Sequence, residues 1–140
     1  MSDTRATSET PVATRGRAVN TTLWVVQVLL AVFFVFVGFV KLAGFQAQVD
    51  AFTEIGLGQW FRYLTGALEV AGGVGLLIPR LSGTAALGLA GVMVGAVITH
   101  LTVLPPAGYA VAPAFLVVVF GLIAWGRRPQ TKALVGKPTH

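Results

Sequence analysis

The chain has 140 residues, of which 55% are hydrophobic and only 11% are charged, and it contains no cysteine. A soluble domain carries about 25% charged residues, so this composition excludes an ordinary soluble fold, and the lack of cysteine excludes disulfides and thiolate metal sites. The net charge of +5 lies mostly outside the apolar runs, which indicates a membrane surface and not nucleic acid as its counterpart.

In chain order, residues 1–20 are rich in Thr, Ser and Ala without an apolar period, and they predict a disordered cytoplasmic tail. Four apolar runs follow, each long enough to cross a hydrocarbon core about 30 Å thick. They cover Leu23–Leu42, Phe61–Ile78, Ser82–Leu104 and about Tyr109–Trp125. We therefore expect an all-α integral membrane four-helix bundle over residues 21–126, capped at its start by Asn20, Thr21 or Thr22, and a basic cytoplasmic tail over residues 127–140.

The connection between the first two runs has a pattern of its own. Phe45, Val49 and Phe52 recur at helical spacing, whereas Asp50 and Glu54 fall on another face. This pattern predicts a short amphipathic helix lying at the membrane interface between helices 1 and 2, with an ordinary loop as the alternative.

The positions of Lys and Arg predict the orientation. The two tails hold most of them, the second loop holds Arg80, and the third loop holds none. Since short cytoplasmic segments carry the excess of Lys and Arg, both termini should face the cytoplasm. The predicted location is a bacterial cytoplasmic (inner) membrane.

Glu69 lies alone among Leu, Val, Ala and Gly in the second apolar run. A carboxylate at bilayer depth costs about 2.5–3.5 kcal/mol, so it requires a polar partner or water. It follows Arg62 by about 10 Å of helix, which places it in the outer half of the bundle with the ends of the first and third runs. The sequence thus predicts a buried polar cluster of Glu69, Lys41, Arg62 and His100, which is either a structural ion pair or a ligand-binding site. It predicts no metal site.

Small residues also recur at helical spacing, and such residues let membrane helices approach closely. The positions predicted to pack helices are Gly38, Gly66, Gly72, Gly73, Gly88, Gly91 and Gly95. Packing within one chain and packing between two copies are both compatible with Gly91 and Gly95, so a homo-oligomer is left open.

Three passages, VGFVKLAGF, LTGALEVAGGVGLLIPR and AGVMVGAVITHL, occur in this order along the chain. Together they resemble the DoxX family of small four-helix bacterial membrane proteins over about residues 23–126. The resemblance is carried by Gly38 with Lys41, and by Glu69 with Gly72 and Gly73. It implies a membrane bundle grouped with a subunit of thiosulfate:quinone oxidoreductase and with helpers of redox-enzyme maturation.

Three functions compete on these grounds. The first is an accessory or assembly subunit of a quinone-linked membrane redox system, with no intrinsic cofactor, a quinone as the expected ligand and a membrane or periplasmic redox protein as partner. The second is a small transporter or channel for a polar solute or proton that uses Glu69. The third is an enzyme with Glu69 and His100 as acid and base, but no nucleophile or cofactor motif accompanies them. We expect that the chain is not an enzyme by itself.

Overall fold

The computed structural model describes residues 10–135, and within this range every regular element is helical, as the sequence predicts. The long helices are α1 (Thr10–Ala43), α3 (Gln59–Leu76), α4 (Ser82–Thr102) and α5 (Val111–Gly126). Three shorter elements connect or follow them, namely α2 (Gln46–Ile55), the 3-10 helix η1 (Ala107–Ala110) and α6 (Arg128–Val135).

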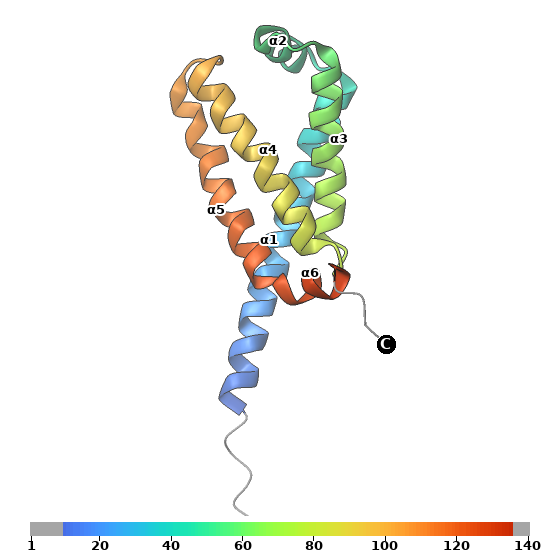
Figure 1. Ribbon diagram of the computed structural model, residues 1–140, viewed down its shortest axis with the longest axis vertical. Coiled ribbons are helices and arrows are strands. Elements are labelled where there is room, and N and C mark those ends of the chain that lie inside the picture. The colour runs from blue at the N-terminus through green and yellow to red at the C-terminus, as the bar shows by residue number, and fades with distance from the viewer. Residues whose placement is uncertain (1–9, 136–140) are drawn as a thin grey trace, which may run out of the picture.

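The long helices form two antiparallel pairs. Helix α1 packs along α3, α4 packs along α5, and α3 and α4 join the pairs. The pairs lie close together near α6 and diverge toward α2 (Figure 1). We call these the α6 end and the α2 end of the molecule. The first and last described residues both lie toward the α6 end (Figure 1).

The buried core fills the part of the molecule where the two pairs meet. The rings of Phe34 on α1 and Phe120 on α5 meet edge to face with centroids 5.3 Å apart. Around them pack buried side chains from all four long helices, namely Ala31, Leu76, Ala86, Leu89, Met93 and Ile123. These contacts fix the pairs against each other at one end only.

The outward faces of the helices are apolar. On α1, Leu29 and Val32 are each 66% exposed and Phe36 is 64% exposed. Within residues 10–135, three stretches are long and apolar enough to cross a membrane: Gly16–Ala43, Ser82–Thr102 and Ala107–Gly126. Apolar surface on this scale belongs in lipid, because a soluble monomer rarely exposes such a patch. The protein is therefore a membrane protein.

The structure corrects the predicted start of the first helix. Helix α1 begins at Thr10, so residues 10–20 are helical and Asn20, Thr21 and Thr22 lie inside the helix instead of capping it. Nothing in this segment ends a helix, since Pro11 falls in the first turn, where proline is tolerated. Residues 1–9 and 136–140, the rest of the predicted tails, lie outside the described residues.

The predicted connecting helix is present as α2. Phe52 is buried and its ring lies 5.8 Å from that of Phe61 on α3, whereas Phe45 precedes the helix and is exposed. Asp50 and Glu54 are exposed, as the amphipathic pattern requires. A left-handed Gly56, with φ of 82°, ends the helix, and its N–H donates to the carbonyl of Phe52.

Candidate functional site

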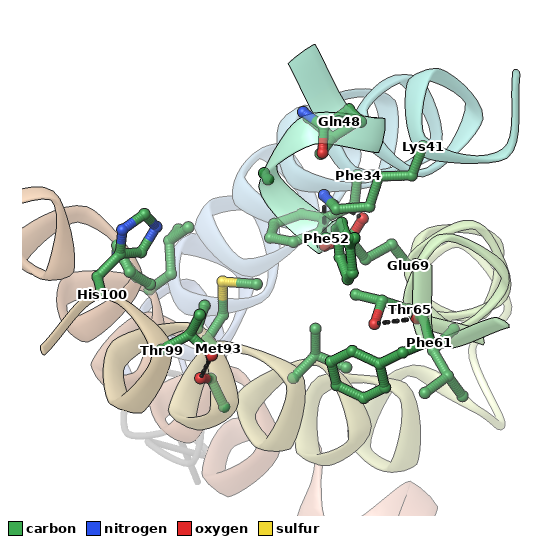
Figure 2. A pocket seen from close by; sticks show the side chains of 18 of the residues that line it. Phe34, Lys41, Gln48, Phe52, Phe61, Thr65, Glu69, Met93, Thr99 and His100 are labelled. Atoms are coloured by element: carbon green, nitrogen blue, oxygen red, sulfur yellow. Dashed lines mark hydrogen bonds and ion pairs between the residues drawn. The ribbon is translucent and has the colours of Figure 1, made fainter. Parts of the chain in front are cut away.

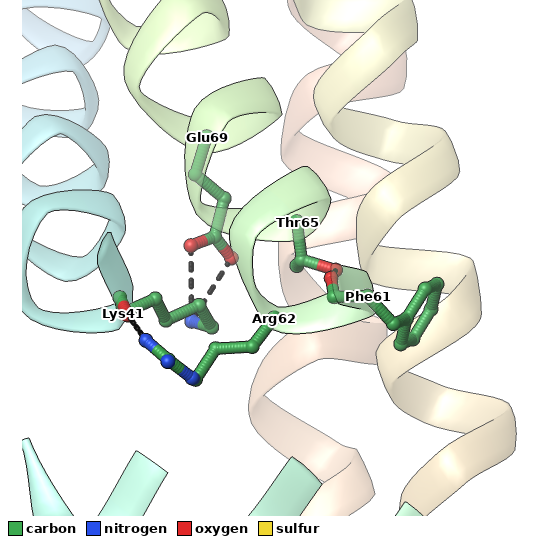
Figure 3. A network of polar contacts seen from close by, with 5 residues as sticks. All are labelled: Lys41, Phe61, Arg62, Thr65 and Glu69. Atoms are coloured by element: carbon green, nitrogen blue, oxygen red, sulfur yellow. Dashed lines mark hydrogen bonds and ion pairs between the residues drawn. The ribbon is translucent and has the colours of Figure 1, made fainter. Parts of the chain in front are cut away.

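The centre of the candidate site is an ion pair between α1 and α3. Nζ of Lys41 lies 2.9 Å from Oε2 of Glu69 and donates a hydrogen bond of 3.2 Å to Oε1 (Figure 3). The contact to Oε2 lacks hydrogen-bond geometry, so this buried oxygen accepts no directional bond. The side chain of Glu69 is 3% exposed and that of Lys41 is 13% exposed. The pair is therefore largely, but not fully, removed from solvent.

Close helix packing explains how a lysine at the end of α1 reaches α3. A Cβ atom at Gly38 would lie 2.7 Å from the carbonyl oxygen of Gly66, and one at Gly66 would lie 2.9 Å from that of Gly38. Two turns away along the same contact, a Cβ at Gly73 would lie 3.0 Å from the carbonyl oxygen of Ala31. These glycines bring the two backbones together directly below the ion pair. We call this contact the α1–α3 seam.

Arg62 does not join the carboxylate. Its Nε donates to Oε1 of Gln59 at 2.7 Å. Its Nη1 donates to the backbone carbonyl of Lys41 (Figure 3). The guanidinium also lies 4.3 Å from the ring centroid of Tyr63. Arg62 thus satisfies a free carbonyl in the last turn of α1, where a cation also favours the helix dipole. In the described part of the chain, Arg62 thus contacts the backbone of Lys41, and the ion pair of Glu69 is with the Lys41 side chain.

A cavity of about 850 Å³ opens where the two helix pairs diverge. Glu69 and Lys41 lie on one wall, and His100 lies across from them on α4 (Figure 2). Helix α2 covers part of the cavity with Gln48 and Phe52 (Figure 2). Most of the remaining lining is apolar and comes from α1, α3, α4 and α5, with Phe33, Phe34, Phe61, Leu68, Met93 and Leu116 among it.

His100 faces this cavity without a fixed partner. Its Nδ1 is buried and makes no hydrogen bond within the described part of the chain. The ring meets that of Tyr109 edge to face, with centroids 6.1 Å apart. His100 is therefore not part of a contact network with Glu69, contrary to the predicted cluster, but the two residues line one cavity. Of the four predicted residues, the structure brings Lys41 into contact with both Glu69 and Arg62, and it separates His100 from these three.

The seven predicted packing glycines divide into two groups. Gly38, Gly66 and Gly73 lie in the α1–α3 seam, and a Cβ at Gly72 would lie 2.6 Å from the side chain of Leu89 on α4. The other three, on α4, pack nothing in the described chain, because a Cβ there would meet no atom within 4 Å. These three are Gly88, Gly91 and Gly95, and all line the cavity.

A second buried polar network lies at the α6 end. Gln27, which is fully buried, donates to the carbonyl of Leu76 at 2.7 Å and accepts from Nε of Arg127 at 2.7 Å. Arg127 also donates to Oδ1 of Asn20 at 2.8 Å and lies 5.1 Å from the ring centroid of Trp24. Burial lowers the pKa of the Arg127 guanidinium, although arginine keeps its charge in proteins.

This network corrects the prediction that Arg127 belongs to a basic tail. The residue is 5% exposed and connects the end of α5 to α1. The sequence feature that indicates this network is Gln27, a polar residue within the first apolar run that needs a hydrogen-bond partner there. Gln48 and Phe52 were also missed as lining residues, because nothing in the sequence shows that α2 folds back over the cavity.

The cavity has the features of a site for a small organic ligand. It combines a large apolar surface with Lys41 and His100, two nitrogen-bearing side chains on separate walls. Among residues 10–135, no group of three or more His, Cys, Asp or Glu side chains could hold a metal ion. Few polar groups in an apolar pocket are typical of sites for small organic ligands.

The molecule is thus a helical membrane protein with one large apolar cavity and an ion pair on its wall. Residues 25–122 match the sequence model of the DoxX-like family, and the chain belongs to this family. No curated protein and no solved structure matches the chain.

Proposed function

We propose that this chain is an accessory subunit of a membrane redox system and that it binds a quinone in the cavity between its helix pairs. The observation that supports this proposal best is the cavity itself. Its volume of about 850 Å³ falls within the range of about 300–1,000 Å³ that is usual for ligand pockets, and its lining is mainly apolar.

The two polar walls favour a ligand that accepts hydrogen bonds on opposite sides. A quinone ring has two carbonyl oxygens that point in opposite directions and an otherwise apolar body. Lys41 has three N–H donors, of which Glu69 engages only part, and His100 can donate through whichever ring nitrogen is protonated. In this arrangement Glu69 holds the lysine ammonium at the cavity wall and balances its charge.

The accessory role rests on the family and on where the cavity lies. The resemblance drawn from the sequence groups such chains with quinone-linked redox enzymes. The cavity, the Lys41–Glu69 pair and His100 all belong to the α2 end of the molecule. A redox protein docking at that end, in the membrane or on its periplasmic face, would reach the bound quinone by the shortest route. Electrons would pass between partner and quinone, with this chain holding the ligand.

The proposal includes a topology. In it, α3 crosses the membrane together with the three more apolar stretches, although Gln59, Arg62 and Glu69 lower its hydropathy. Helix α2 lies at the outer interface of a bacterial cytoplasmic membrane. Both termini are then cytoplasmic. Reporter enzymes that are active only outside the cytoplasm, fused to each end, should stay inactive. Activity at either end would contradict this orientation.

Direct extraction tests the ligand. The protein should be purified from its native membrane in a mild detergent, extracted with organic solvent and searched for quinones by mass spectrometry. The wild-type chain and Glu54→Gln, which changes an exposed carboxylate outside the cavity, should carry quinone. Lys41→Met and Glu69→Gln should carry much less. Equal recovery from all four proteins, or none from the wild type, would contradict the proposal.

The alternative function, transport of a proton or solute, requires a path through the whole molecule. A buried carboxylate facing a cavity is also what a proton or solute carrier needs. Toward the α6 end, however, the cavity is closed by the Phe34–Phe120 core and the Gln27–Arg127 network. Transport would require this packed half to open. Liposomes containing the protein should therefore hold a proton gradient as well as protein-free liposomes; a leak abolished by Glu69→Gln would favour transport.

A further inference from the structure

A second, smaller cavity adjoins the first. It has a volume of about 270 Å³ and runs between α3 and α4. Leu68 on α3 and Gly88 on α4 line both cavities, so the two cavities share a border at these residues. We call the smaller cavity the α3–α4 groove.

The groove leads away from the polar walls. On α3 its lining extends from Leu68 to Gly75, and on α4 from Gly88 to Leu81. Each stretch covers eight residues, or about 10 Å of helix from the first Cα to the last. Because α3 and α4 are antiparallel, both stretches run toward the α6 end, which is the direction of the bilayer interior. Apart from Thr84, the groove is lined only by Ala, Gly and Leu.

The glycines of the groove differ in what surrounds them. A Cβ at Gly72 would lie 2.6 Å from Leu89, and one at Gly75 would lie 2.8 Å from Ala85, so the helices touch at the floor of the groove. A Cβ at Gly88 would meet nothing within 4 Å. At the border between the two cavities, Gly88 therefore presents no side chain and has free space beside it.

We propose that the ligand carries a linear hydrocarbon tail and that this tail lies in the α3–α4 groove while the ring occupies the larger cavity. This inference rests on the proposed function, since it needs a ring bound between Lys41 and His100. The observation that supports it is the border that the two cavities share at Leu68 and Gly88. It narrows the ligand class to membrane-soluble ring compounds with a prenyl or alkyl chain, because a tail-less quinone would leave the groove empty.

A side chain placed at the border between the two cavities should distinguish binding of the tail from binding of the ring. Gly88→Leu places a side chain at this border without a backbone clash. Gly121→Leu is the matched control, because Gly121 on α5 is equally open and lines neither cavity. Both changes replace glycine by leucine within a helix, so their effects on helix stability are alike.

The probes are decylubiquinone and the tail-less dimethoxy-methyl-benzoquinone, measured by equilibrium dialysis at one detergent concentration. Partition of the probe into micelles then cancels when each variant is compared with the wild type. In Gly88→Leu, the dissociation constant of decylubiquinone should rise about tenfold, at the low end of the cost of overpacking a fitted site. The dissociation constant of the tail-less probe should rise clearly less, although Gly88 also borders the larger cavity, and Gly121→Leu should change neither constant.

The outcomes distinguish this inference from the proposed function. If neither probe binds the wild type, the proposed function fails and the inference with it. If both probes bind but Gly88→Leu weakens them equally or not at all, only the tail assignment is overturned. If Gly88→Leu instead dissolves a dimer and leaves both affinities unchanged, the groove is an interface between two copies of the chain, and the inference is again overturned.

Discussion

Two groups of glycines, those of the α1–α3 seam and those of α4, have opposite roles in this molecule. In the α1–α3 seam, Gly38 and Gly66 bring two backbones so close that a single added methyl group would strike a carbonyl oxygen. On α4, Gly91 and Gly95 have no neighbour within 4 Å of where a Cβ would be. The glycines of the seam allow two helices to touch, whereas those of α4 leave free space beside the helix.

The difference teaches what glycine spacing does and does not encode. A small residue every three or four positions shows that one helix face lacks side chains. Whether a second helix fills the space depends on the rest of the fold. Here α3 fills it for α1, and the divergence of the helix pairs leaves it open on α4 (Figure 1). The polar groups follow the same division, since the Gln27 network is enclosed and the Glu69 pair borders the cavity.

The strongest test of this comparison is to replace one glycine of each group by alanine, which adds a single methyl group. Gly38→Ala should lower the free energy of unfolding by about 3 kcal/mol, because its Cβ meets the Gly66 carbonyl oxygen and the Val70 side chain at 2.7 Å. Gly91→Ala should cost nothing, and it gains up to about 1 kcal/mol of helix propensity. Thermal unfolding in detergent measures both. Equal losses would mean that α4 packs as tightly as α1.

The next largest effect concerns the enclosed network. Gln27→Leu keeps a similar volume but leaves the Leu76 carbonyl and Nε of Arg127 without their partner. We expect a loss of about 2 kcal/mol in unfolding free energy and unchanged quinone binding. Weaker binding in a variant that stays folded would show that the two ends of the molecule are coupled.

A smaller loss is expected at the Lys41–Glu69 pair. Glu69→Gln leaves the charge of Lys41 unbalanced, but that side chain is 13% exposed and partly solvated, so the loss should be about 1–2 kcal/mol, less than for a dry pair. Adding Lys41→Met should restore stability without restoring quinone binding. Adding Arg62→Met should not restore stability, because Arg62 bonds the Lys41 carbonyl and not Glu69. Recovery of quinone binding in the Glu69→Gln, Lys41→Met variant would show that the ion pair has only a structural role.

The smallest effects belong to the carboxylates of α2. Asp50→Ala removes only an exposed hydrogen bond from Gln46, and Glu54→Ala changes an exposed side chain. Each should alter the unfolding free energy by no more than about 0.5 kcal/mol. Losses comparable with that of Glu69→Gln would indicate that α2 contributes charge to the site as well as covering it.

The sequence predicted the helices because their apolar runs and Pro or Gly boundaries are local signals. It also indicated that Glu69 needs a partner, since burial alone demands one. It could not select Lys41 over Arg62, because that choice depends on where the last carbonyls of α1 fall relative to α3. Likewise, the enclosed position of Arg127 depends on the path of the chain after α5, and the cavity depends on the angle between the helix pairs.

The length of α1 has a consequence for anything that meets the chain from the α6 end. Its 34 residues form a rod of about 51 Å, whereas a hydrocarbon core takes up about 30 Å. Even with some tilt, on the order of 20 Å of helix extends past the lipid, and Figure 1 shows it standing clear of the other helices. A partner attached there would be held at a fixed height above the membrane, and removing one helical turn would lower it by about 5 Å.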